Sequence, residues 1–176
     1  KVASGAYGGT IYIKGERTII DTSVFNSSSA KQGGIIHIEG EQAVIRASDF
    51  ANSSSTSMGG AISVNGHNAT IDGSTFDNVE ANSNGGAIYV DGEDTDILYS
   101  SFDNCVAKSQ GGAIYIYDKD TTVAYSNFTL CKANIAGAIA INGINTEISY
   151  CNLDNTTALG KDNKGYSGGA IKVFGN

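Results

Sequence analysis

The stretch GGAISVNG, residues 59–66, decides the fold because it recurs along the chain. Close copies are GGAIYVDG at residues 85–92 and GGAIYIYD at residues 111–118. Each copy opens on a small dipeptide, Gly-Gly or in one case Ala-Gly. These dipeptides begin at Gly8, Gly33, Gly59, Gly85, Gly111, Ala136 and Gly168. A repeat of about 26 residues is typical of a solenoid built from stacked coils.

A second marker, an aromatic residue, follows each dipeptide at a fixed distance. Phe25 lies 17 residues after Gly8, and Phe76 lies 17 residues after Gly59. The same interval holds in every coil, with Leu153 as the last marker, whereas the interval from marker to next dipeptide varies from 8 to 15 residues. The segment of constant length from dipeptide to marker, which we call the constant arc, indicates fixed strands and turns. The segment of varying length from marker to next dipeptide, the variable arc, indicates a loop that accepts insertions.

The residue pattern of the constant arc predicts short strands. In Ile88-Tyr89-Val90, and in its counterparts, apolar residues flank a variable middle residue. Because side chains alternate along a strand, we expect Ile and Val to point inward and the middle residue to face solvent. Two further strands are expected around Ile71 and Phe76. Asn65-Gly66, Asp91-Gly92 and Asn142-Gly143 are expected to form turns with positive φ.

Together these features predict an all-β fold, a right-handed single-stranded parallel β-helix (solenoid). We expect about six to seven coils of about 26 residues, with three short strands per coil. Helical solenoids are excluded because no window shows amphipathic helical spacing. Residues 1–176 are expected to form a single β-helix domain that is a fragment of a longer solenoid, since the pattern runs to both ends without a polar cap. Open ends would also allow end-to-end self-association.

Charge and hydropathy restrict the partners. The chain carries 11 Lys and Arg against 18 Asp and Glu, a net charge of −7, and has no basic run. Phosphate binding needs a concentrated basic surface, so we expect no nucleic-acid partner. No apolar stretch approaches the roughly 20 residues that cross a bilayer, so we expect no membrane-spanning segment.

The Gly-Gly-Ala-Ile copies, with a Phe-x-Asn segment before them, resemble the adhesin-like repeat proteins of methanogenic archaea. In repeat style these are related to the polymorphic outer-membrane proteins of chlamydiae, whose repeats carry GGA[ILV] and FxxN. Here Asn78 lies two residues after Phe76 rather than three, which favours the archaeal group. The resemblance implies an extracellular protein, at the cell surface or associated with the cell wall. It also implies adhesion to a protein or glycan on a host or neighbouring cell.

Aromatic columns are the first candidate contact surface. The middle column of the strand after each dipeptide includes Tyr12, His37, Tyr89 and Tyr115, and a second column holds Tyr99, Tyr125 and Tyr150. A flat row of Tyr offers apolar area and polar tips to a sugar or protein at low entropy cost. The alternative is that like residues stack only to support one another.

The longest variable arc is the second candidate surface. It contains Lys161, Asp162, Asn163, Lys164 and Tyr166. Insertions in repeat proteins protrude from one face and often carry contacts. A loop without function is the alternative.

Clustered carboxylates are the one candidate for a metal. Asp91, Glu93 and Asp94 fall in one turn, and Asp118 and Asp120 fall in the equivalent turn one coil later. Grouped oxygen ligands suit Ca²⁺, although a solvated acidic surface explains the same pattern. No other cofactor is expected.

Cysteine spacing gives no metal site. Cys105 and Cys131 occupy equivalent positions of adjacent coils, close enough for a disulfide but equally suited to remain stacked thiols. Cys151 is expected to be a buried thiol. The spacing of the three residues does not suit zinc.

The predicted function is that of a non-catalytic adhesin or structural rod. The alternative is a carbohydrate-active, pectate-lyase-like β-helix enzyme or a degenerate enzyme scaffold. Such enzymes need grouped carboxylates beside a base, or Ca²⁺ with a nearby Arg. His37 and His67 have no relay partner in their own motifs, and Arg17 and Arg46 lie away from the acidic turns. We therefore expect no catalytic residue.

Overall fold

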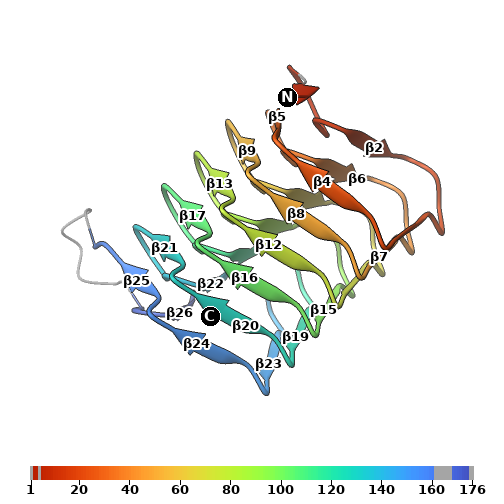
Figure 1. The fold of residues 1–176 in the computed structure, drawn as a ribbon. Helices are drawn as coiled ribbons and strands as arrows, with labels where there is room; N and C mark the ends of the chain where they lie inside the picture. Colours follow the sequence, from red (N-terminus) through yellow and green to blue (C-terminus); the bar gives the residue numbers. More distant parts are fainter. Residues whose placement is uncertain (1, 4, 161–167, 175–176) are drawn as a thin grey trace.

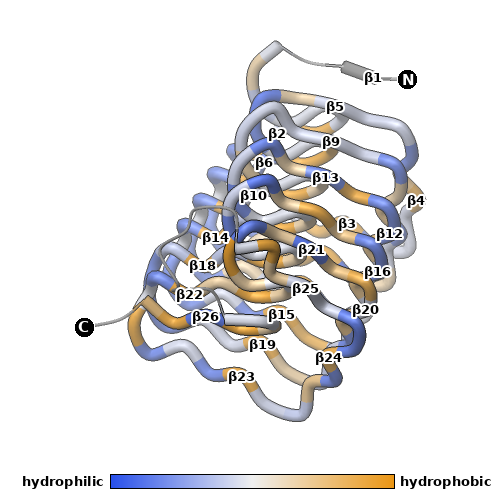
Figure 2. The backbone as a smooth tube through the Cα atoms, turned by 90° about the vertical axis from the view of Figure 1, so that its left-hand side faces the viewer, coloured by the Kyte–Doolittle hydropathy of each residue, from blue (hydrophilic) through white to orange (hydrophobic). Residues whose placement is uncertain are grey.

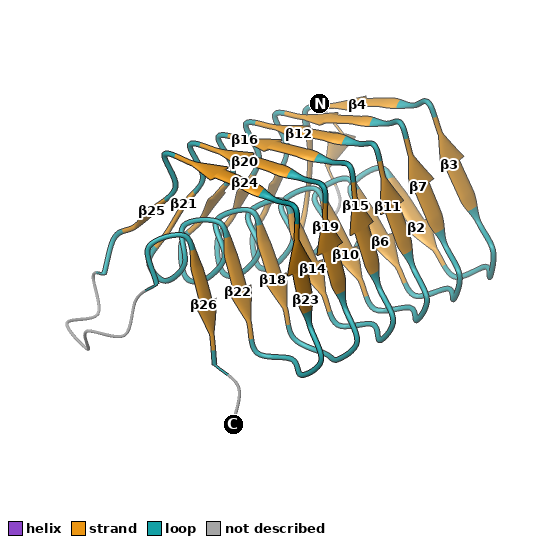
Figure 3. Cartoon of the chain, turned by 90° about the horizontal axis from the view of Figure 1, so that it is seen from below, coloured by secondary structure: helices purple, strands orange, loops and turns teal. Residues whose placement is uncertain are grey.

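The computed structural model describes residues 2–3, 5–160 and 168–174. These residues form a parallel β-solenoid with no helix among them (Figures 1 and 3). Each coil contributes one short strand to each of four parallel sheets, which run along the stack. Equivalent residues pair in register between coils, as Ile62 does with Ile36 on one side and with Ile88 on the other. The predicted parallel β-helix is therefore confirmed.

The first sheet follows the small dipeptides. Its strands are β2 (Ile11–Ile13), β6 (Ile36–Ile38), β10 (Ile62–Val64), β14 (Ile88–Val90), β18 (Ile114–Ile116), β22 (Ile139–Ile141) and β26 (Ile171–Val173). The second sheet comprises β3 (Ile19–Asp21), β7 (Val44–Arg46), β11 (Thr70–Asp72), β15 (Asp96–Leu98), β19 (Thr122–Ala124) and β23 (Glu147–Ser149).

The third sheet carries the Phe markers. Its strands are β4 (Val24–Asn26), β8 (Asp49–Ala51), β12 (Thr75–Asp77), β16 (Ser101–Asp103), β20 (Asn127–Thr129) and β24 (Asn152–Asp154). The fourth sheet comprises β1 (Val2–Ala3), β5 (Ser28–Ala30), β9 (Ser54–Ser55), β13 (Glu80–Ala81), β17 (Val106–Ala107), β21 (Lys132–Ala133) and β25 (Thr157–Ala158).

The three strands predicted for each coil are those of the first three sheets. The fourth sheet was not predicted. It lies in the variable arc, and its strands are only two or three residues long. These strands consist largely of Ser, Ala, Glu, Lys and Thr, which give little strand signal. Backbone hydrogen bonds between equivalent segments of successive coils form this sheet even where the side chains give no strand pattern.

The interior consists of columns of like residues. The Phe markers stack face to face, with ring centroids 4.8 to 5.2 Å apart from Phe25 to Phe128. Ile45, Ile71 and Ile97 form the inward column of the second sheet and are fully buried. Hydrophilic residues recur at the same corners of successive coils, so the stack has a uniform polar edge (Figure 2). The repeat thus places equivalent residues in straight rows along the solenoid.

Each coil turns at left-handed residues, with φ between 47° and 64° in four columns. One column is the first position of the small dipeptide, from Gly8 to Ala136. The other three comprise Arg17, Gln42, Asn68, Asp94, Asp120 and Asn145; Thr22, Ala47, Gly73, Tyr99, Tyr125 and Tyr150; and Ser27, Asn52, Asn78, Asn104, Leu130 and Asn155. Gly and Asn recur in these columns because they tolerate positive φ best.

One predicted turn was wrong in detail. Gly66, Gly92 and Gly143 were expected to supply the positive φ after the first strand, but the left-handed residues lie two positions later, at Asn68, Asp94 and Asn145. Gly66 has a different role. A Cβ there would collide with the carbonyl oxygen of Gly40, so the glycine permits close contact between coils.

Candidate functional site

The middle column of the first sheet does not face solvent as predicted. Tyr89 and Tyr115 are each only 7% exposed and stack 5.7 Å apart. They form a second apolar cluster with Ala136 and Ala140, against which Met58, Ile135 and Phe174 pack. Met58 and Ile135 immediately precede the small dipeptides, whose left-handed first residue turns the chain back over the strand. Burial therefore raises the pKa of both tyrosines.

The other two predicted members of this column differ from each other. His37 is 3% exposed, so its predicted exposure was wrong, whereas Tyr12 is 42% exposed. Tyr7 stacks on the His37 ring at 4.7 Å, and Glu39 lies 3.7 Å from His37 Nε2. A hydrogen bond with Glu39 raises the pKa of Tyr12 to about 12. Of the four residues predicted to form an open face, only Tyr12 is exposed.

An exposed aromatic surface lies instead at the corner between the second and third sheets. Tyr99, Tyr125 and Tyr150 stack with centroids 4.8 Å apart and ring planes within 8° of parallel. They are 61%, 46% and 78% exposed, and we call them the tyrosine ladder. The middle ring is the least exposed because neighbours cover both of its faces. The ladder lies at the turns that join β15, β19 and β23 to β16, β20 and β24, a corner of the coils that can be followed in Figure 1.

The corner backbone positions the ladder. Each tyrosine is left-handed, with φ of 49° to 53°, and the column begins with Thr22, Ala47 and Gly73 at the same turn. A left-handed conformation costs a residue with a side chain roughly 1–2 kcal/mol. Three bulky tyrosines are held there although the turn would accept Gly. The same conformation occurs at non-glycine residues of the other turn columns, such as Arg17 and Leu130, so it belongs to the coil architecture.

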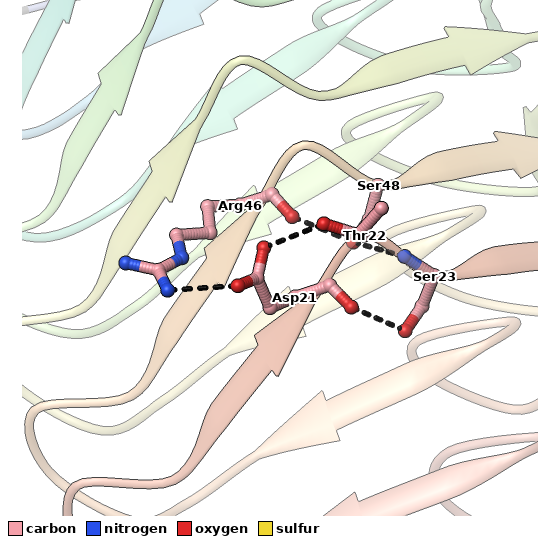
Figure 4. Close-up of polar contacts among 5 residues, drawn as sticks. All are labelled: Asp21, Thr22, Ser23, Arg46 and Ser48. Carbon is pink, nitrogen blue, oxygen red and sulfur yellow. Dashed lines mark hydrogen bonds and ion pairs between the residues drawn. The ribbon is translucent and has the colours of Figure 1, made fainter.

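Polar residues frame this corner in the first coils (Figure 4). The Arg46 guanidinium donates a hydrogen bond of 2.7 Å to Asp21, and the Thr22 hydroxyl donates to the same carboxylate. Both contacts hold the pKa of Asp21 below its usual value. Asp72 pairs in register with Arg46 from the next coil, so opposite charges alternate along this edge.

A serine ladder lies directly beneath the corner. The Ser48 hydroxyl donates to the Arg46 carbonyl and accepts the Ser23 backbone N–H, a pattern drawn in Figure 4 and repeated in the coils of Ser74 and Ser100. Ser48, Ser74, Ser100 and Ser126 are at most 1% exposed. Because each serine hydroxyl links adjacent coils, the serine ladder gives the tyrosine ladder above it a rigid, hydrogen-bonded base.

The acidic residues predicted as Ca²⁺ ligands have separate partners. Asp91 accepts a hydrogen bond from Asn65, and burial raises its pKa. Lys119 Nζ lies 3.2 Å from Glu93 and 3.8 Å from Asp120. Asp118 accepts the Lys119 backbone N–H, while Asp94 and Asp120 line a polar groove. In the part of the chain that the structure describes, no three His, Cys, Asp or Glu side chains group as for a metal, and Ca²⁺ binding stays a prediction.

The remaining candidates are the insertion, which lies outside the described residues, and the three cysteines. Lys161, Asp162, Asn163, Lys164 and Tyr166 of the insertion lie outside the described residues. Cys105 and Cys131 are buried as free thiols, and burial raises the pKa of Cys105. Cys151 is half-buried and continues the serine column, with its Sγ 3.3 Å from the Ser149 carbonyl oxygen.

Comparison of the chain with protein-family models, with curated proteins and with solved structures gives no match. Among the described residues no helix is long and apolar enough to cross a membrane. The adhesin-like resemblance therefore stays a prediction. One sequence signal did mark the exposed ladder. Gly73 shares the column of Tyr99, which indicates a turn position, and side chains at a turn point away from the core.

Proposed function

We propose that this β-solenoid is a non-catalytic contact module, a surface adhesin or structural rod, and that the tyrosine ladder is its contact surface. The observation that carries the proposal is the exposure of Tyr99, Tyr125 and Tyr150 in a continuous stack at one corner of the solenoid. An aromatic row that only supported the fold would gain more from burial.

The ladder suits adhesion physically. Parallel rings 4.8 Å apart present a row of ring edges and hydroxyl groups, so a partner meets apolar area and hydrogen-bonding groups together. The rings are already ordered by their neighbours and by the serine ladder. Binding therefore orders few further side chains, which lowers its entropic cost. The partner we propose is a glycan or protein on a host or neighbouring cell, which places the protein outside the cell.

The contacts that Arg46, His37 and His67 already make support a non-catalytic function over the lyase-like alternative. Arg46 is paired with Asp21, and His37 is buried beneath Tyr7. His67 Nδ1 accepts the Glu93 backbone N–H. Arg46 is held by a carboxylate, His37 is shielded from solvent and His67 Nδ1 is occupied as an acceptor, so none of the three is poised as a general base.

Bead adhesion tests this proposal. Beads coated with the protein are applied to cultured cells, and retention is compared with that of the triple variant Tyr99→Ser, Tyr125→Ser, Tyr150→Ser. We expect the triple variant to lose most retention, whereas Tyr89→Phe with Tyr115→Phe, a matched change at buried tyrosines, retains it. Equal retention by the triple variant would rule out the ladder as the contact surface. Release of shortened oligosaccharides from a polysaccharide panel would favour the enzyme instead.

A further inference from the structure

We propose that the space beside Tyr99, in the coil of Gly73, binds one pyranose ring of a neutral glycan. The inference rests on the proposed function and names the ligand class for one end of the tyrosine ladder. Three observations carry it: an uncovered ring face, a missing side chain and a polar rim.

The uncovered face belongs to Tyr99. Tyr125 stacks on one face of this ring at 4.8 Å, and Gly73 occupies the ladder position on the other side. No side chain of this column covers the second face, which agrees with Tyr99 being 61% exposed while the sandwiched Tyr125 is 46% exposed. The ladder therefore ends in a flat aromatic platform that faces along the solenoid.

Because Gly73 has no side chain, a space as tall as the separation between adjacent coils lies beside Tyr99. A Cβ built at Gly73 would meet only the Ala47 backbone nitrogen, at 4.0 Å. Beyond Gly73 the next residue of the column is Ala47, whose side chain is a single methyl group. A planar group stacked on Tyr99 would thus take the place that a further tyrosine ring would occupy. A pyranose ring has this thickness, and its C–H groups can pack on an aromatic face.

The rim supplies hydrogen-bonding groups. Asp72 precedes Gly73 directly and pairs in register with Leu98, the neighbour of Tyr99. On the other flank the Thr75 hydroxyl donates a 2.6 Å hydrogen bond to Asp49. Arg46 lies on the coil before Asp72. Carboxylates accept hydrogen bonds only, so they suit a ligand rich in hydroxyl donors.

The same rim sets the charge of the ligand. Asp72 ends the strand before Gly73, and Asp49 begins a strand of the preceding coil just beyond this corner. The only cation among the four rim residues, Arg46, is already paired with Asp21. The whole chain carries a net charge of −7. An anionic glycan would be repelled at this corner, whereas a neutral hexose is not.

A glycan array of neutral glucose, galactose and mannose oligosaccharides tests the site, followed by calorimetric titration with the strongest binder. We expect wild type to bind and Tyr99→Ser to lose at least about tenfold in affinity, which corresponds to 1.4 kcal/mol. Gly73→Tyr should abolish binding, because its ring would stack on Tyr99 and fill the space. Gly73→Ala, which copies Ala47 of the preceding coil, and Tyr117→Ser, at an exposed tyrosine outside the ladder, should bind within about threefold of wild type.

The outcomes separate this inference from the proposed function. Unchanged glycan affinity in Gly73→Tyr, or no array binding while beads still adhere through the ladder, would overturn the inference and leave the contact module standing. Retained bead adhesion by the triple variant would overturn the contact module itself. Thermal melting checks that each variant is folded, and Tyr99→Ser decides the question if Gly73→Tyr does not fold.

Discussion

At the scale of single residues, the small dipeptide combines two different backbone demands. Its first glycine is left-handed, as at Gly85, where φ is 64°. Its second glycine is packed against the next coil, since a Cβ at Gly86 would collide with the Gly112 carbonyl oxygen. The first position needs a left-handed backbone and has little room beside the Ile88 carbonyl oxygen, whereas the second has no room beside the next coil. Ala136 shows that the first position tolerates a methyl group in one coil, with φ of 58°.

Gly85→Ala should lower the free energy of unfolding by about 2 kcal/mol or more. A left-handed alanine costs roughly 1–2 kcal/mol, and the new Cβ would also clash with the Ile88 carbonyl oxygen. Urea unfolding followed by circular dichroism measures the change. Gly15→Ala is the matched control, because a Cβ there meets only Thr18 Oγ1, at 3.6 Å, and it should change stability little. A loss of similar size in both variants would contradict the explanation.

The buried His37 should make the fold sensitive to mild acid. Burial lowers the pKa of His37 below its usual 6.5, against the opposing effect of Glu39. The unfolded chain therefore binds a proton more readily, so stability is full above about pH 6.5 and falls as the pH drops toward the lower pKa of the folded state.

Urea midpoints at about pH 7.5 and about pH 5.5 measure this effect, since His is the side chain that ordinarily titrates between them. His37→Gln should flatten the difference. A midpoint that does not move between the two pH values in wild type would contradict the account of His37.

At the scale of elements, the strands are too short to be stable alone and depend on their neighbours in adjacent coils. Strands of two or three residues gain their hydrogen bonds only from equivalent strands above and below. The serine ladder adds side-chain links at the corner between the second and third sheets. We therefore expect each hydroxyl of the serine ladder to stabilise the two coils that it joins.

Ser74→Ala should lower the free energy of unfolding by about 1–3 kcal/mol, because it leaves the buried Ser48 N–H without its acceptor. Ser74→Cys should cost less, since Cys151 already fills this column and contacts the carbonyl of Ser149 in the same way as the serines. Chemical unfolding measures both. An alanine variant as stable as wild type would show that the ladder does not hold the coils together.

The sequence predicted the elements better than the surfaces. The fixed interval from dipeptide to Phe marker located three strands correctly. Solvent exposure failed because alternation in a strand tells which side chains point away from the core, not whether another segment covers them. Met58 and Ile135 cover Tyr89 and Tyr115 from a position that no periodicity links to the strand. The fourth sheet failed for a related reason, since backbone pairing rather than side-chain pattern forms it.

At the scale of the whole molecule, the solenoid converts a one-dimensional repeat into straight edges of like residues. Phe and Ser columns make the interior rigid, and the tyrosine ladder is the aromatic edge exposed to solvent. Surface position thus depends on which of the four corners a residue occupies. We predict that partner contact occurs at the corner that carries Tyr99, Tyr125 and Tyr150.

Tyrosine nitration, mapped by mass spectrometry with and without bound cells, tests this claim most directly. Exposed Tyr7, Tyr12 and Tyr117 serve as internal references on other surfaces. We predict that Tyr99, Tyr125 and Tyr150 react in the free protein and become protected on cell binding, while the references react equally in both states. Protection of Tyr7 or Tyr12 with an unchanged ladder would contradict the account.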